Sequence, residues 1–253
     1  MAINKKIMHF RNERARELER MAKLLEKCIG SDVNTTSIYK AISDLRNENS
    51  IPVLKNGSYD QNIWGYDIED FEMTIDTLKH VKPDCIKNGK VNVSIKLRAK
   101  IENWLDMNDP FVELCFNVFL KGIGDKVYHF GFHIDRHNSI VATIEPHPIY
   151  HIQYDINPTG SSEPDLGSIM YIDTPRLLHY PLDFILGINF LTSNFFPTAF
   201  NILCEENDFF KLNLEYQERI WKPYFHSIAN HWKPFEQASI TWQPTTYLLP
   251  TLV

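Results

Sequence analysis

The sequence predicts an α+β protein with a central antiparallel meander of four to five strands, N-terminal helices, and C-terminal helices packed on the apolar face of the sheet. Between residues 91 and 155, apolar and polar side chains alternate along several segments, which is typical of half-buried strands. Before residue 46 and after residue 181, apolar side chains recur every three to four residues, which is typical of amphipathic helices. Each predicted strand has one apolar face, and the flanking helices would cover it. The expected organisation is a helical pair at 1–50, an α+β core domain at 63–232 and an extended C-terminal tail at 233–253.

Three helices are expected before the sheet. The first runs over 10–29, and the second follows Asn34, which is a suitable N-cap residue. A polar connector at 47–62 separates them from a third helix at 68–81, where Ile68, Phe71, Ile75 and Leu78 recur at helical spacing. We expect this third helix to end before Pro83, because proline disfavours a helical residue in front of it.

Four strands are predicted at 91–101, 112–120, 127–137 and 147–155, with a short fifth strand at 168–173. Two helices should follow, at 181–204 and 205–232. The apolar stretch at 181–203 approaches the length of a membrane span, but Asp183, Asn189, Asn194 and Pro197 interrupt it, so a buried core helix is the better interpretation.

Composition narrows the class of protein. A net charge of −6 argues against a protein that coats nucleic acid, although a local basic face is compatible with it. Four scattered cysteines without a C-x-x-C pair favour reduced thiols over disulfides or structural zinc. No signal peptide is recognisable, so we expect a cytoplasmic protein that does not insert into a membrane. No phosphate-cradling loop or dinucleotide fingerprint is present, so no nucleotide cofactor is predicted.

Five of the ten histidines fall between residues 129 and 151. Alternation places them on the polar face of the third and fourth strands, together with two aspartates; these residues are His129, His133, Asp135, His137, His147, His151 and Asp155. If paired residue numbers sum to 284, His133 lies opposite His151, His137 opposite His147, and Gly131 opposite Gln153. A glycine there would leave room for a ligand. The connection at 138–146 is long enough to allow other registers.

The simplest interpretation of this face is a solvent-exposed polar surface without a specific function. Three functional interpretations are the alternatives. His133, Asp135 and His151 have the ligand types of a zinc, manganese or iron site, but no short metal-binding signature accompanies them, so no metal ligand is assigned. Alternatively, His133 and His151 act with Asp135 as catalytic acid and base on a phosphodiester. The phosphate-binding or nucleic-acid-binding residues would then be Lys96, Arg98, Lys100, His137 and His147. In the third interpretation the face binds a partner or nucleic acid without chemistry. Stacking of RNA bases is disfavoured, because the aromatic residues are expected on the opposite face.

The Phe-His-Ile-Asp run at 132–135, followed by His-Pro-Ile-Tyr-His at 147–151, resembles an uncharacterised group of bacterial proteins that includes TumE-like toxins and accessory proteins encoded near defence genes. Residues 182–196 are similar to the Phe- and Ile-rich helix that follows in that group. The likeness covers about a third of the chain, and it departs at His133, where the group's pattern has Arg. It implies a bacterial cytoplasmic setting and a toxin, antitoxin or anti-phage module, without a mechanism.

The expected function is therefore that of a component of a bacterial anti-phage defence or toxin–antitoxin system. It would act through a protein partner, with nucleic acid as a further contact. The apolar residues at 247–253 would dock either on the protein's own domain or on that partner. The alternative is a small nuclease that uses the histidine-rich sheet face.

Overall fold

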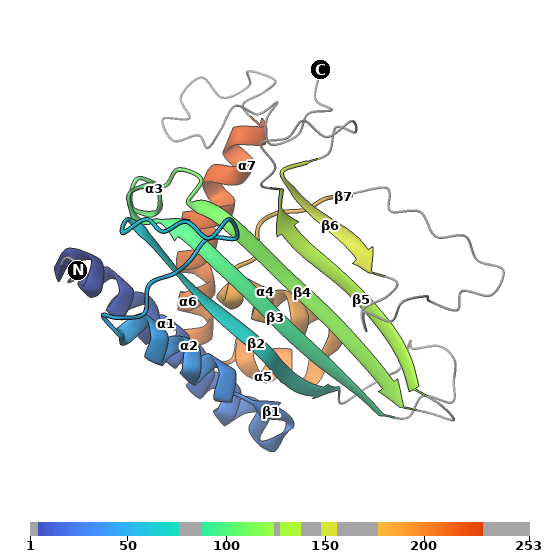
Figure 1. The fold of residues 1–253 in the computed structure, drawn as a ribbon. Coiled ribbons are helices and arrows are strands. Elements are labelled where there is room, and N and C mark those ends of the chain that lie inside the picture. The colour runs from blue at the N-terminus through green and yellow to red at the C-terminus, as the bar shows by residue number, and fades with distance from the viewer. Residues whose placement is uncertain (1–4, 76–87, 124–126, 138–147, 156–176, 230–253) are drawn as a thin grey trace.

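The computed structural model describes residues 5–75, 88–123, 127–137, 148–155 and 177–229 (Figure 1). The α+β class is confirmed, and the sheet is an antiparallel meander whose strands follow one another in chain order from β1 to β7. The predicted count of four to five strands is wrong, because the described residues contain seven. Their bounds are β1 Val33–Asn34, β2 Ile63–Ile75, β3 Asn88–Lys100, β4 Phe111–Ile123, β5 Val127–Arg136, β6 Tyr150–Asp155 and β7 Leu177–Leu178. The strand predicted at 168–173 and the tail at 233–253 lie outside the described residues.

The helices frame the sheet. They are α1 Lys5–Ile29, a 3-10 turn Gly30–Asp32, α2 Thr36–Arg46, α3 Ile101–Leu105, α4 Phe184–Phe195, α5 Pro197–Cys204, α6 Asn207–Tyr216, a π-helical turn Gln217–Trp221 and α7 Lys222–Ala229. Pro197 divides the first predicted C-terminal helix, because it begins α5 as its first residue. The N-cap of α2 is Thr35 rather than Asn34, whose side chain instead accepts a hydrogen bond of 3.1 Å from Thr36 N. None of the helices in the described part combines the length and apolar composition that crossing a membrane requires.

The helix predicted at 68–81 is wrong, because Ile63–Ile75 forms the long strand β2, while residues 76–87 lie outside the described part. The strand carries a β-bulge between Ile68 and Phe71, where its register against β3 shifts. The one extra residue of β2 keeps Ile68 and Phe71 on the same face although they are three positions apart, and three is also a helical spacing. Asp70, within the bulge, has a positive φ of 55°.

The apolar face of the sheet meets the helices in one hydrophobic core. Figure 1 shows α4 to α7 together on the far side of the sheet, with α1 and α2 along β2. Helix α4 crosses several strands: the Phe184 ring lies 5.5 Å from that of Phe71 on β2, and the Phe190 ring lies 6.2 Å from that of Phe132 on β5. At the crossing, Gly187 lies so close to β4 that a Cβ would lie 2.2 Å from the Phe116 ring. The helices therefore pack on the apolar face of the sheet and do not cover its opposite, polar face.

A buried polar cluster lies between α1, α4, α6 and β2. Glu17 is held by Arg14 Nη2 at 2.6 Å and by the Tyr216 hydroxyl at 2.5 Å. Asp183 caps α4 by accepting a hydrogen bond of 3.0 Å from Leu186 N. Burial raises the pKa of the Asp183 carboxyl to about 7, and it also raises the pKa of Glu17 despite the nearby arginine.

Candidate functional site on the polar sheet face

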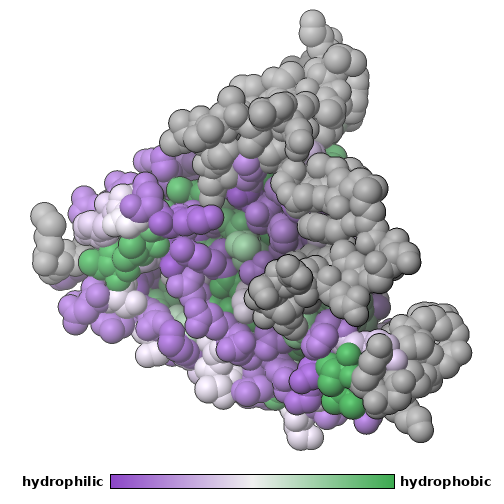
Figure 2. Space-filling view, turned by 45° about the vertical axis from the view of Figure 1, so that its right-hand side comes forward, coloured by the Kyte–Doolittle hydropathy of each residue, from purple (hydrophilic) through white to green (hydrophobic). Residues whose placement is uncertain are grey.

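The polar face of the sheet carries two neighbouring rows of side chains that cross the strands. One row runs from β2 to β6 through Asp67, Lys96, Cys115, Asp135 and His151, each opposite the next. The adjacent row contains Ser94, Asn117, His133 and Gln153. Figure 2 shows that hydrophilic residues cover most of the described surface in a view turned from that of Figure 1, with hydrophobic residues in smaller patches between them.

The predicted register of the histidine strands is wrong by two residues. Paired residue numbers sum to 286, so Asp135 lies opposite His151, His133 opposite Gln153, and Gly131 opposite Asp155. A shift of two residues keeps every side chain on its predicted face, because successive side chains alternate between faces. His133 and His151 are therefore diagonal neighbours rather than a directly opposed pair.

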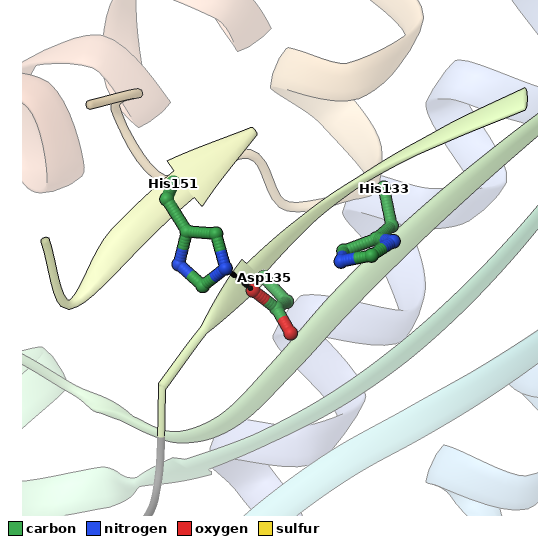
Figure 3. A group of neighbouring side chains, drawn as sticks. All are labelled: His133, Asp135 and His151. Carbon is green, nitrogen blue, oxygen red and sulfur yellow. Dashed lines mark ion pairs between the residues drawn. The ribbon is translucent and has the colours of Figure 1, made fainter. Parts of the chain in front are cut away.

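His133, Asp135 and His151 form a compact cluster, which we call the His-Asp-His cluster. One ligand atom from each residue lies within 4.8 Å of the other two. Figure 3 shows the three side chains directed toward one another, two from β5 and His151 from β6. The closest pair is His151 Nε2 and Asp135 Oδ1, at 3.1 Å, and the His133 and His151 rings are 6.3 Å apart. Two imidazoles and one carboxylate are suitable ligands for one transition-metal ion.

The cluster is shielded on the β6 side and open on the β5 side. The His151 side chain is 4% exposed, whereas that of Asp135 is 30% exposed and that of His133 is half-buried. Asp135 Oδ1 is itself buried and accepts no hydrogen bond within the described part of the chain, although it contacts His151. A buried carboxylate oxygen without a hydrogen bond is costly unless a cation compensates it. A protonated His151, whose Nε2 lies 3.1 Å away, or a metal ion bound by both side chains would supply that cation, so this oxygen is a suitable ligand for a metal ion.

Cys115 lies directly opposite Asp135, but it is not an activated thiol. Burial and the nearby Asp135 carboxylate raise its pKa, and its Sγ lies 3.4 Å from Asn117 Oδ1. Because the thiolate is the nucleophilic form, this environment disfavours covalent catalysis by Cys115.

Arg98 is not available to bind a phosphate. Its guanidinium is bidentate to Asp67, at 2.9 and 2.7 Å, and its Nε donates to Val53 O in the 47–62 connector at 3.1 Å. The side chain is 6% exposed. Gly65, opposite Arg98, permits this packing, since a Cβ there would lie 2.9 Å from Arg98 Cδ and 2.0 Å from Leu97 O. Arg98 therefore fastens the connector to the sheet.

The other predicted phosphate ligands differ in their positions. Lys96 is 41% exposed, lies in the same row as Asp135 and pairs with Glu113 at 3.3 Å. Lys100 is exposed four residues farther along β3, so about 13 Å separates it from Lys96. His137 follows β5 and donates its backbone N–H to Ile149 O at 2.7 Å. His147 lies outside the described residues.

A groove of about 600 Å³ continues along the polar face from the row of His133. Its lining is polar and aromatic, and comprises Asp70, Glu72, Lys90, Asn92, Ser94, Asn117, Val118, Phe119, Lys121, Gly131 and Phe132. Phe119 belongs to the polar face because it pairs with Gly131, and its ring stacks on His129 with centroids 5.3 Å apart. The expectation that aromatic residues lie only on the opposite face is therefore wrong.

The sequence contained a signal for Phe119 but none for Asp70. Phe119 follows Cys115 and Asn117 at spacings of two, so the alternation along β4 already places it on the polar face. Asp70 reaches the groove through the bulge in β2, and a bulge cannot be read from alternation.

Comparisons with models of protein families, with curated proteins and with solved structures find no match to this chain. The resemblance of residues 132–151 to TumE-like proteins therefore stays a prediction.

Proposed function

We propose that the protein is a small metal-dependent nuclease that hydrolyses phosphodiesters with one divalent transition-metal ion bound by the His-Asp-His cluster. The observation that supports this proposal is the convergence of the three ligand atoms within 4.8 Å. The groove lies beside this cluster, because its lining includes Asn117, the residue opposite His133. Catalytic metal sites commonly use three protein ligands of these types and keep positions for water and substrate.

The chemistry is hydrolysis by metal-activated water. A bound zinc ion lowers the pKa of its water to about 7, so that a hydroxide forms near neutral pH. If His133, Asp135 and His151 held such an ion, it would supply this nucleophile for a phosphodiester. The new bond from oxygen to phosphorus would replace the ester P–O bond, and solvent would protonate the leaving oxygen. Lys96 lies two strands from Asp135, about 10 Å across the sheet, and its ammonium group supplies positive charge near the phosphoryl oxygens.

Hydrolysis of bis(p-nitrophenyl) phosphate, RNA and DNA tests this function. Protein freed of metal with EDTA should be inactive, and Zn²⁺ or Mn²⁺ should restore cleavage. His133→Ala and His151→Ala should lower the rate at least about 100-fold, because the loss of a metal ligand should exceed the 10- to 100-fold effects of residues that only orient ligands.

His226→Ala is the matched control, because it removes an exposed histidine on α7 that belongs to neither the cluster nor the groove. Equal rates with EDTA and with metal would contradict a requirement for a metal ion. Intact substrates under every condition would contradict the enzyme.

We further propose that the protein acts with a protein partner in a bacterial, cytoplasmic defence or toxin–antitoxin system. Two exposed apolar side chains on α6 favour a partner. Phe210 is 61% exposed and Leu214 is 43% exposed, and they lie one helical turn apart on the same side of the helix. Adjacent exposed apolar side chains are typical of interaction surfaces. The tail at 247–253, the other expected docking segment, lies outside the described residues.

Association with the purified product of a neighbouring gene tests the partner proposal. We expect the double variant Phe210→Ser, Leu214→Ser to lose binding in a pull-down while it keeps its circular dichroism spectrum. Leu105→Ser is the control, because Leu105 on α3 is equally apolar and 65% exposed. Undiminished binding of the double variant would count against α6.

A further inference from the structure

We propose that the groove beside the His-Asp-His cluster receives an unpaired nucleobase, which stacks on Phe119. This inference rests on the proposed nuclease function, because it assigns the substrate of that site as a single strand of nucleic acid.

The ring of Phe119 is positioned as a stacking platform. His129 supports it in a nearly parallel arrangement, with an interplanar angle of 14°, and both side chains project from the polar face. Phe119 is half-buried and also lines the groove, so part of its ring borders open space. The residue opposite is Gly131, which has no side chain to fill that space. Aromatic rings in open grooves of this kind bind bases through their π-faces.

The polar lining suits the edge of a base. Asn92, Ser94 and Asn117 supply amide and hydroxyl groups that both donate and accept hydrogen bonds. Asp70 adds a carboxylate, which accepts from Asn92 Nδ2 at 3.4 Å. The positive φ of Asp70 is uncommon for a residue other than glycine, and such backbone conformations cluster at functional sites.

The balanced charges of the groove disfavour a duplex. Lys90 is paired with Glu72 at 2.6 Å, and both line the groove with Asp70 and Lys121. Two acidic and two basic side chains therefore balance. A duplex, which is bound mainly through its phosphates, needs an excess of positive charge that this groove does not have.

The geometry connects the groove to the cluster. Phe119 and Gly131 lie four residues along their strands from Cys115 and Asp135, which corresponds to about 13 Å. A base on Phe119 and a phosphate at the cluster therefore belong to nearby positions of one strand. The groove would select unpaired nucleic acid, because a base within a duplex cannot expose its face to the ring.

Binding of a six-nucleotide single strand that contains the fluorescent base 2-aminopurine tests this inference. The titration is done in EDTA, so that neither cleavage nor metal contributes. We expect quenching of the fluorescence on binding, and affinity at least about tenfold weaker for Phe119→Ala and Phe119→Leu, because loss of base–aromatic stacking has effects of this size. Phe119→Tyr should bind within about threefold of wild type, since its ring still stacks.

Several controls keep the outcome decisive. Phe130→Ala removes an aromatic side chain that is 47% exposed on the other face of the sheet, and it should bind like wild type. A strand without a base at the tested position should bind as weakly as Phe119→Leu, and adenosine monophosphate should bind more weakly than the strand. Unchanged affinity of Phe119→Leu, or equal affinity of wild type for the abasic strand, would contradict the stacking site. Tighter binding of adenosine monophosphate than of the strand would show that the base comes from a mononucleotide.

Failure of the groove and failure of the nuclease function give different results. The Zn²⁺ affinity of Phe119→Leu should equal that of wild type, because Phe119 is not a member of the cluster. Stacking without any hydrolysis would contradict the nuclease alone. Hydrolysis with binding that does not depend on Phe119 would contradict the groove alone.

Discussion

Asp183→Asn is expected to remove from the protein a pH dependence worth about 4 kcal/mol in the free energy of unfolding. Burial is the main cause that raises the pKa of Asp183 from 3.8 to about 7. Its protonated form is therefore stabilised in the folded state. The stability that this proton provides is fully present below pH 4 and is lost as the pH rises to 7, by about 1.4 kcal/mol per pH unit. Asn is neutral at every pH and still accepts the capping hydrogen bond from Leu186 N.

Urea unfolding at pH 4, 5.5, 7 and 8 measures this effect. The variant should gain stability relative to wild type across the series, whatever the constant cost of its buried amide. Groups around Asp183 also respond to pH or carry charge, namely Glu17, Arg14 and Tyr66, but they are present in both proteins. Asp106→Asn, at an exposed carboxyl, should run parallel to wild type. Parallel curves for Asp183→Asn would show that folding does not raise the pKa of Asp183.

Arg98→Met should lower the free energy of unfolding by about 3 kcal/mol without lowering the hydrolysis rate of the folded protein. The substitution keeps much of the side-chain volume, but it removes the paired bonds to Asp67 and the bonds to the carbonyl oxygens of Val53 and Tyr66. Hydrogen bonds to charged groups contribute about 1.5–3 kcal/mol each, and part of this is recovered because Asp67 is 40% exposed to water.

Denaturant unfolding and the hydrolysis assay together test the role of Arg98. Lys96→Met is the matched control for the unfolding measurement, because it removes a cation from the same strand and face at an exposed position. It should change stability by less than about 1 kcal/mol. A fully stable Arg98→Met protein that no longer hydrolyses the substrate would restore Arg98 as a phosphate ligand.

The sequence alone is sufficient to predict which side chains lie on the polar face, but not which residues of β5 and β6 lie opposite each other. Alternation along β5 and β6 placed His133, Asp135 and His151 on one side, and the structure confirms that shared face. The register depends on the connection at 138–147 and on backbone hydrogen bonds, and alternation does not change when a strand slides by two residues. That shift makes Asp135 the direct neighbour of His151 and thereby brings a carboxylate between the two histidines.

Two other predictions are wrong because the pattern of side-chain types along a segment does not contain bulges or contacts with distant segments. The bulge in β2 changes the spacing of its apolar residues from two to three at Ile68 and Phe71, and the segment was therefore predicted as a helix. Arg98 follows the polar alternation faithfully, yet the connector at 47–62 folds over it and buries it. Contacts of this kind arise from tertiary structure, which the local pattern does not contain.

The meander order has a consequence for the way in which the chain assembles during synthesis. Every strand pairs with its neighbour in sequence, so the sheet can form by short-range steps, which favours rapid folding. The helices that cover its apolar face behave differently: α1 meets the C-terminal helices across nearly the whole chain, through ion pairs of Arg20 with Asp208 and of Lys27 with Glu206. The order of the chain therefore allows the strands to pair before residues 184–229, which cover much of the apolar face, have left the ribosome. During that interval an exposed apolar sheet face would make the chain prone to aggregation, unless aggregation is slow or chaperones cover the face.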